Sequence, residues 1–327
     1  MSGYWVIVNE ESVLSVLDAI PTDVSNAVYN LHYGNNLVSF YALPDDLTLG
    51  ADIIPACTDN NFVAIMTEGA SALCIGDNNW IGSLTEVSQD DGYWVKVSED
   101  MTLDLTDAEP VSYDADGGVV YDNHLGNNLI SYPFAYPQSI GDALGDAAGN
   151  VYAIAGEGVA TLNTVDGWMG SLQAFEGGKG YWLISNAEEG FTFTFNGVQA
   201  GLTRTAEQPA MREVPDLYRF TQSSQQAFSF IESATIKNKT LDSEDIIIAY
   251  NDNGVVGSRY WGGEYTDIPV MGIDPNYIQE TSNYCSEGDK ITFKVLVASS
   301  GELVDMDADP ILPWINMGTP IVNLVEK

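Results

Sequence analysis

The side chains in this sequence that are best suited to catalysis or metal binding are two histidines and a large excess of carboxylates. His32 and His124 occupy equivalent positions in two similar segments. A zinc site usually gathers several His or Cys ligands, and a serine nucleophile elbow needs a G-x-S-x-G motif, which the sequence lacks. Among the 47 acidic residues, no pair stands in a distinctive setting for glycoside hydrolysis. We therefore expect each histidine to cap a strand or bind local backbone, and we predict that the chain is not an enzyme.

Oxygen-bearing side chains gather around one expected strand in the C-terminal part of the chain. They precede and follow residues 246–250 and are Asp242, Glu244, Asp245, Asn251 and Asp252. Ca²⁺ prefers hard oxygen ligands of this kind on loops. The spacing lacks the full EF-hand pattern, and Asn253-Gly254 already explains the segment as a hairpin turn. The sequence is thus compatible with a Ca²⁺ site, and turn chemistry is the simpler interpretation.

Three tryptophans lie in turn-like settings beside glycines, and they are candidates for stacking on sugar rings. They are Trp80, Trp168 and Trp261. Turn residues are often exposed, which favours a binding role. The alternative is that Trp80 and Trp168, both followed by Gly-Ser-Leu, fold back to cover a small core. We expect Trp94 and Trp182, which lie in strand-like segments, to be core residues.

None of the three cysteines belongs to a metal-type CxxC pair. Cys57 and Cys74 are compatible with a disulfide and equally with two buried free thiols. Cys285 lies far from both in the sequence.

An internal repeat must position most of these residues. The segments that match in order are residues 32–39 with 124–131, 65–69 with 154–158, 80–84 with 168–172, and 92–95 with 180–183. A period of about 90 residues is too long for a solenoid coil or a propeller blade, so each copy is expected to be a small domain. Within the first copy we predict a short helix and several strands: a helix at 47–54 and strands at 37–41, 62–66, 70–75, 93–97 and 102–105.

The C-terminal third shows no trace of the repeat. Short strand-like segments separated by Asn, Asp and Gly predict an antiparallel β-sandwich there. Gly3 to Val8 resembles the end of a repeat, so the chain is expected to begin inside a further copy. The predicted fold class is mainly β with minor α, and its divisions are a remnant at 1–20, repeats at 21–108 and 109–198, a linker at 199–213 and a sandwich at 214–327.

Two resemblances cover nearly all of the chain. The repeats resemble modules of large secreted or surface-exposed bacterial proteins with a "GWNLIS…GYW" pattern, and Asn35 and Asn127 stand here where Trp is usual. Residues 234–259 and 288–295 resemble a β-sandwich module of secreted bacterial proteins, which ends in a Gly-Asp-x-Ile-x-Phe-Lys-Val segment like the one here. The resemblances imply an extracellular or cell-surface location and a modular architecture.

The charge of the chain excludes several classes of partner. A formal net charge of −36 repels nucleic-acid backbones and anionic membrane surfaces, and no apolar run is long enough to span a bilayer. We predict a non-catalytic segment of an extracellular or cell-surface protein, with a structural, adhesive or protein-contact role. The alternative is a carbohydrate-binding array attached to a hydrolase. Its partners would be protein or polysaccharide at the cell surface, and Ca²⁺ is the one cofactor that the sequence suggests.

Overall fold

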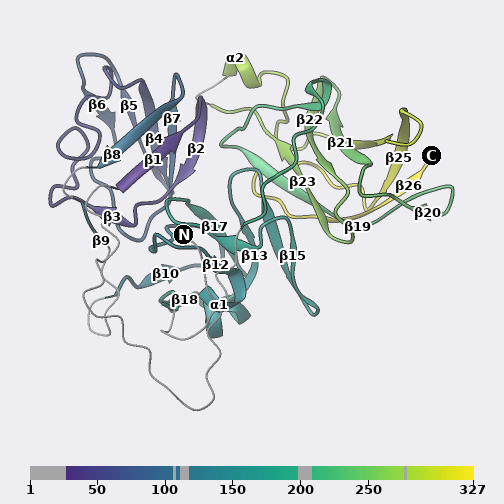
Figure 1. Ribbon diagram of the computed structural model, residues 1–327, viewed down its shortest axis with the longest axis horizontal. Helices are drawn as coiled ribbons and strands as arrows, with labels where there is room; N and C mark the ends of the chain where they lie inside the picture. The colour runs from purple at the N-terminus through teal and green to yellow at the C-terminus, as the bar shows by residue number, and fades with distance from the viewer. Residues whose placement is uncertain (1–26, 106–107, 111–117, 198–207, 276–277) are drawn as a thin grey trace, which may run out of the picture.

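The computed structural model describes residues 27–105, 108–110, 118–197, 208–275 and 278–327, and these residues are mainly β with little helix (Figure 1). This confirms the predicted fold class. The segment at 3–8 that was matched to the end of a repeat lies outside the described residues. No described helix is long and apolar enough to cross a bilayer.

The first repeat is built on one antiparallel sheet of five strands. The strands of the whole repeat, inside and outside this sheet, are β1 (Ala27–Leu31), β2 (Gly34–Val38), β3 (Ala42–Leu43), β4 (Phe62–Thr67), β5 (Ala70–Cys74), β6 (Trp80–Gly82), β7 (Tyr93–Val97), β8 (Met101–Leu105) and β9 (Glu109–Pro110). The five-stranded sheet has the order β2-β7-β4-β5-β6, and β1-β8 and β3-β9 form separate antiparallel pairs. The core lies on one side of this sheet, where alternate residues such as Val38, Tyr93 and Val95 are buried.

The second repeat has the same strand order and the same register. Its elements are β10 (Tyr121–Asn123), β11 (Gly126–Ile130), β12 (Gln138–Ser139), α1 (Ile140–Leu144), η1 (Gly145–Asn150), β13 (Val151–Ala155), β14 (Ala160–Thr164), β15 (Gly167–Gly170), β16 (Ala174–Phe175), β17 (Tyr181–Ser185) and β18 (Phe191–Phe193). The sheet order is β11-β17-β13-β14-β15, and β10 pairs with β18 as β1 does with β8. Leu129 faces Trp182 as Leu37 faces Trp94. The sequence repeat is thus a structural repeat.

The helix predicted at residues 47–54 is wrong for the first repeat. This segment forms turns and isolated bridges, because Gly50 has a φ of +86° and a left-handed residue cannot continue an α-helix. The second repeat does form the short helix α1 at the corresponding place. Its N-cap is Ser139, whose hydroxyl oxygen accepts a hydrogen bond from the amide of Asp142 at 3.3 Å.

The C-terminal part is a folded-over sheet of eight strands. The elements are η2 (Asp216–Tyr218), β19 (Gln226–Ile236), β20 (Lys239–Thr240), β21 (Ile246–Asn251), β22 (Gly254–Tyr260), β23 (Thr266–Met271), α2 (Ile278–Thr281), β24 (Thr292–Val297), β25 (Glu302–Asp309) and β26 (Ile321–Glu326). The order is β20-β19-β26-β25-β24-β21-β22, and β23 pairs with the first half of β19. Because β19 takes part in both halves, the sheet closes over one core, which includes Ile247, Val270 and Phe293.

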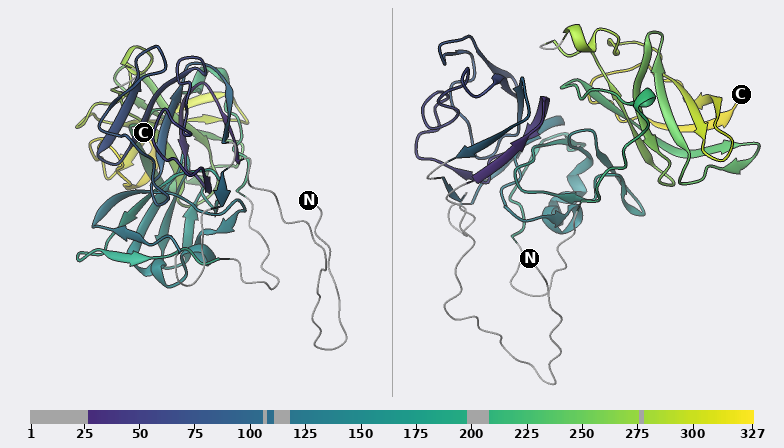
Figure 2. Two further views of the ribbon diagram at one scale, coloured as in Figure 1. Left: turned by 90° about the vertical axis from the view of Figure 1, so that its left-hand side faces the viewer. Right: turned by 45° about the horizontal axis from the view of Figure 1, so that its top comes forward.

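The three units lie against one another. Figures 1 and 2 show the first repeat in purple to blue, the second in teal, and the sandwich in green to yellow, with the C-terminus on the side away from the repeats. Isolated β-bridges join the repeats, one between Val38 and Lys179 and one between Asp91 and Ile130. These junctions position the side chains described next.

Candidate functional site

The two histidines lie at the junction of the repeats, and each contacts the repeat to which it does not belong. His32 Nε2 donates a hydrogen bond to Glu157 of the second repeat. His124 Nε2 donates to Glu68 of the first repeat at 2.9 Å. The two histidines are equivalent positions of the repeat, and so are the two glutamates. The junction is therefore reciprocal in the manner of an isologous dimer interface, although both halves belong to one chain.

Each glutamate also binds a backbone amide of the opposite repeat. Glu157 Oε2 accepts from the amide of Leu37 at 3.1 Å, and Glu68 Oε2 accepts from the amide of Leu129 at 3.1 Å. Each carboxylate thus joins a histidine and a strand of the neighbouring repeat. We call these four side chains, His32, Glu157, His124 and Glu68, the clasp.

The Gly-Asn-Asn motif shapes the loop that presents each histidine. Gly34 has a φ of +95°, which favours glycine. The side chain of Asn36 accepts a hydrogen bond from the amide of His32 and donates one to its carbonyl oxygen, both at 2.9 Å. The second repeat repeats this arrangement around Asn128. The prediction that the histidines serve local backbone was incomplete, because it did not include the contact across the junction.

Both ring nitrogens of each histidine face oxygen acceptors. Nδ1 of His32 lies 2.8 Å from the carbonyl oxygen of Tyr33, and Nδ1 of His124 lies 2.8 Å from that of Leu125. Neither a carbonyl nor a carboxylate oxygen can donate, so only a doubly protonated imidazolium satisfies both sides. The hydrogen bond to Glu157 accordingly raises the pKa of His32 above its usual value. The carbonyl of Leu125, followed by Glu68, raises the pKa of His124.

Burial works to raise the pKa of Glu157, but the hydrogen bond from His32 and the charge of Lys179 outweigh it, and its pKa is lowered. A histidine with a raised pKa stabilises the fold below its unfolded pKa, and this contribution is lost as the pH rises through the folded pKa. A glutamate with a lowered pKa stabilises the fold above its unfolded pKa, and this contribution is lost as the pH falls through the folded pKa. The clasp therefore stabilises the fold most in the weakly acidic range, above the unfolded pKa of the glutamate and below the unfolded pKa of the histidine.

We expect both histidines to titrate above a pH of about 6.5, the value of an unperturbed imidazole. Proton NMR of the two imidazole rings measures this directly. Glu157→Gln should lower the pKa of His32 and leave that of His124 unchanged, and Glu68→Gln should do the reverse. A wild-type pKa at or below the unperturbed value for both rings would show that the clasp does not form in solution.

An apolar cluster with members from both repeats also lies at the junction. It contains Leu37, Trp94 and Leu129, with Met66 and Trp182 packed beside them. Trp94 is buried, at 3% exposure. The prediction that these tryptophans are core residues is confirmed for Trp94, and Trp182 is partly buried against the same cluster. Both project from the face of the sheet opposite the core of their own repeat. They cover the junction instead.

Glycine is required where the Gly-Tyr-Trp motif crosses the junction. The amide of Gly180 donates to the carbonyl of Leu37, and that of Gly92 donates to the carbonyl of Leu129, both at 3.2 Å. A Cβ atom at Gly180 would lie 2.6 Å from the carbonyl oxygen of Val38, and one at Gly92 would lie 2.7 Å from a backbone oxygen of the second repeat. The recurrence of this glycine in both repeats is explained by the close backbone contact.

The sandwich binds the second repeat through a buried ion pair. Arg259 lies 3.3 Å from Asp267, and the two side chains are 8% and 1% exposed. Asp267 also accepts from the amide of Ala160 at 3.0 Å and from the amide and hydroxyl of Ser171 at 2.8 Å. Arg259 donates to the carbonyl of Gly158. Sequence reasoning missed this pair, since the segment around it carries no recognisable motif.

The three tryptophans that were candidates for stacking on sugars pack against cores, as the alternative interpretation of Trp80 and Trp168 expects. Trp80 and Trp168 are partly buried against the cores of the first and second repeats, and Trp80 Nε1 donates to the carbonyl of Ile54 at 3.4 Å. Trp261 is 5% exposed and belongs to the sandwich core. The expectation that Trp261 is an exposed turn residue is therefore wrong, whereas Trp80 and Trp168 are partly exposed.

The predicted calcium ligands do not converge. The carboxylate of Asp245 accepts from the amide of Asp242 at 2.8 Å and from that of Ala298 at 2.9 Å, so it serves as a backbone cap. Within the ranges that the structure describes, no group of three or more His, Cys, Asp or Glu is arranged to hold a metal ion.

The other three predicted ligands have different surroundings. Glu244 forms an ion pair with Arg212 at 2.8 Å. The side-chain oxygen of Asn251 accepts from the amide of Gly254 at 3.0 Å, which is turn chemistry. Asp252 is exposed on the same turn. These contacts agree with the simpler of the two interpretations made from the sequence.

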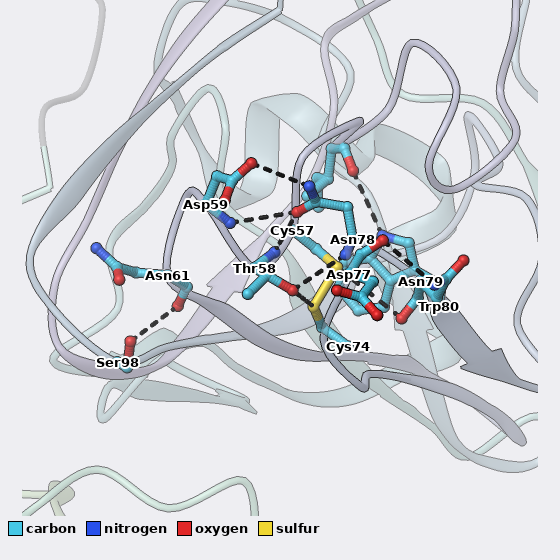
Figure 3. The surroundings of a disulfide bond; sticks show 11 residues. Cys57, Thr58, Asp59, Asn61, Cys74, Asp77, Asn78, Asn79, Trp80 and Ser98 are labelled. Carbon is cyan, nitrogen blue, oxygen red and sulfur yellow. Dashed lines mark hydrogen bonds between the residues drawn. A yellow bond between two sulfur atoms is a disulfide. The ribbon is translucent and has the colours of Figure 1, made fainter.

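Cys57 and Cys74 form a disulfide, which settles the alternative left open by the sequence. It joins the turn before β4 to the last residue of β5, and the loop around it is held by polar contacts (Figure 3). The side-chain oxygen of Asn78 accepts from the amide of Thr58 at 2.8 Å, and its amide donates to Asp59 at 3.0 Å. Cys285 is free and buried.

Two concave sites involve the sandwich. One, of about 240 Å³, is apolar and is lined in part by Phe293, Ile311 and Trp314. The other, of about 330 Å³, lies between the second repeat and the sandwich and includes Tyr260 and Asp267 in its wall. Glu264 also lines this second site, and the carboxylate of Asp267 is engaged by Arg259, Ala160 and Ser171. Comparisons with protein families, curated proteins and solved structures gave no match to this chain.

Proposed function

We propose that this chain is a non-catalytic structural segment of an extracellular or cell-surface protein, in which the two repeats and the sandwich act as one rigid spacer. The reciprocal clasp is the observation that carries the proposal. Two independent domains on a flexible tether would not need matched histidine–glutamate pairs, paired backbone and a shared apolar cluster at their junction. The buried pair of Arg259 and Asp267 extends the same rigidity to the sandwich.

Three further features support the assignment. The disulfide between Cys57 and Cys74 is of a kind that persists in oxidising compartments. The strong negative charge keeps such a segment soluble and discourages nonspecific association. The packing of Trp80, Trp168 and Trp261 against cores favours a spacer over an array of sugar-stacking platforms. The partners of the spacer would be proteins or polysaccharides of the cell surface.

Rigidity is tested by small-angle X-ray scattering of the full chain. We expect the wild type to scatter as one compact particle with the three units in the arrangement seen here. The double variant Glu68→Gln, Glu157→Gln should expand, because both halves of the clasp are lost while the cores of the repeats are untouched. The double variant Glu99→Gln, Glu188→Gln removes the same charge from exposed positions and serves as the matched control.

Two outcomes would contradict the proposal. If the wild type scattered as an ensemble of separated units, the chain would not be a rigid spacer. Specific retention by an immobilised polysaccharide, lost on substitution of an aromatic residue, would favour the carbohydrate-binding alternative.

A further inference from the structure

The first repeat buries a lysine where the second buries an apolar residue. Lys96 is 3% exposed and lies directly opposite Asn35 in the pairing of β7 with β2. The equivalent pair in the second repeat is Ile184 opposite Asn127. Ile184 packs with Phe228 and other apolar side chains of the sandwich. Lysine is rarely buried, because its ammonium group loses its hydration, so its presence at this one position calls for a chemical reason.

The surroundings of Lys96 place an amide and a carboxylate beside it. Side chains directly opposite in an antiparallel pair lie on the same face, with Cβ atoms about 4.5–5.5 Å apart, so the ammonium group can reach the amide of Asn35. The Nδ2 atom of Asn35 donates to Asp274 Oδ2 at 2.8 Å. Asn35 and Asp274 are 1% and 0% exposed, and Asp274 belongs to the sandwich. Lysine and carboxylate are thus both next to the Asn35 amide, and all three side chains are almost fully buried.

We propose that Lys96 and Asn35 react to form an intramolecular isopeptide bond, with Asp274 as the proton relay. Nζ of Lys96 attacks Cγ of Asn35, the bond from Cγ to Nδ2 breaks, and ammonia leaves. A lysine ammonium and an asparagine amide become a secondary amide and an ammonium ion, so atoms and charge balance and no oxidant or cofactor is needed. Asp274 takes a proton from the lysine and passes it to the departing nitrogen, which it already contacts.

The local chemistry favours each part of this step. Burial lowers the pKa of Lys96, although Asp274 and Glu280 oppose the shift, and a neutral amine is the nucleophilic form. The Oδ1 atom of Asn35 is buried without a hydrogen-bond partner among the described residues, while its Nδ2 donates to Asp274 at 2.8 Å and to the carbonyl oxygen of Gln222 at 3.4 Å, so the leaving nitrogen and not the carbonyl oxygen is the held end of the amide. The amide and hydroxyl of Ser224 donate to Asp274 Oδ2 at 3.0 and 2.9 Å and hold the carboxylate in place.

Two consequences follow from the positions of the three residues. The bond would tie β2 to β7 within the first repeat and would enclose the disulfide between Cys57 and Cys74. Because Asp274 comes from the sandwich, the reaction requires the sandwich to be docked on the first repeat. The cross-link would therefore form after the units assemble. It does not depend on the spacer function proposed above.

Mass spectrometry of the full wild-type chain tests the proposal. We expect the reduced protein to be lighter than its sequence by the mass of one ammonia. Trypsin should fail to cut after a cross-linked Lys96, which is the first Lys or Arg of the chain, with Lys179 the next. Fragmentation of the resulting peptide covering residues 1–179 should place the cross-link between Asn35 and Lys96. Lys96→Arg and Asp274→Asn should each have the full sequence mass. Asn127→Ala, at the equivalent position of the second repeat, should still lose ammonia.

Three results would overturn the proposal, and none requires a variant to fold. The first is a folded wild type with the full sequence mass and normal cleavage after Lys96. The second is a loss of ammonia located at Asn196-Gly197 or Asn253-Gly254, where asparagine can cyclise onto its own backbone. The third is a loss of water with a cross-link between Lys96 and Asp274, which would make Asp274 the reacting partner and leave no role for the amide of Asn35.

Discussion

Replacing Asp267 by alanine is expected to lower the free energy of unfolding by about 3–5 kcal/mol, the usual result of removing one partner from a buried ion pair. Arg259 would remain 8% exposed without its counter-charge. The amides of Ala160 and Ser171 would also lose their carboxylate acceptor. Urea denaturation of the full chain, followed by fluorescence and by circular dichroism, measures the loss.

Two further variants separate this effect from a general effect of charge. Asp305→Ala removes an exposed carboxylate that pairs with Lys294 at 2.9 Å, and it should leave the denaturation midpoint almost unchanged. The double variant Asp267→Ala, Arg259→Met removes both charges and should recover part of the loss, because no unpaired charge stays buried. Should Asp267→Ala unfold at the wild-type midpoint, the ion pair would not be buried in solution.

The repeat and its approximate strands could be predicted from the sequence because duplication leaves a signal that needs no knowledge of packing. The ordered matches around Gly34 and Gly126, and around Trp94 and Trp182, fix which segments are equivalent. The structure then shows the same sheet order in both repeats. The helix predicted at 47–54 is wrong because local propensity does not reveal the left-handed conformation of Gly50.

The junction between the repeats could not be predicted with the same success. All five residues of β2 and of β7 are buried, so the usual alternation between core and solvent faces is hidden. Burial on both faces is known only from the structure, and the residue types of these strands do not identify the surface that covers them. A signal for a charged junction was present in the repeat itself. Glu68 recurs as Glu157, and His32 recurs as His124.

The contacts of the sandwich were beyond sequence reasoning for a different reason. Asp267 and Asp274 are two carboxylates among many, and what distinguishes them is burial against a particular partner. That partner is fixed by how the units dock, which depends on shape over the whole interface. Lys96 is the exception, since a lysine between the apolar residues Val95 and Val97 of a predicted strand is unusual and its equivalent is Ile184.

Trp94→Ala is expected to be the most damaging single change at the junction of the repeats. A large buried aromatic side chain typically contributes about 3–5 kcal/mol relative to alanine, and Trp94 is packed between Leu37 and Leu129 of opposite repeats. The loss should appear as a lower midpoint in urea and also as an expanded particle in X-ray scattering, because the side chain lies outside the core of its own repeat.

A matched control is available on the same strand. Val95 is fully buried but faces the core of the first repeat, so Val95→Ala should lower the midpoint by a smaller amount without expanding the particle. Trp182→Ala should resemble Trp94→Ala, and the double variant should cost less than the sum of the two, because both rings contribute to one cluster. If Trp94→Ala lowered the midpoint but left the scattering unchanged, the tryptophan would be stabilising its own repeat. The polar contacts of the clasp would then be sufficient to hold the repeats together.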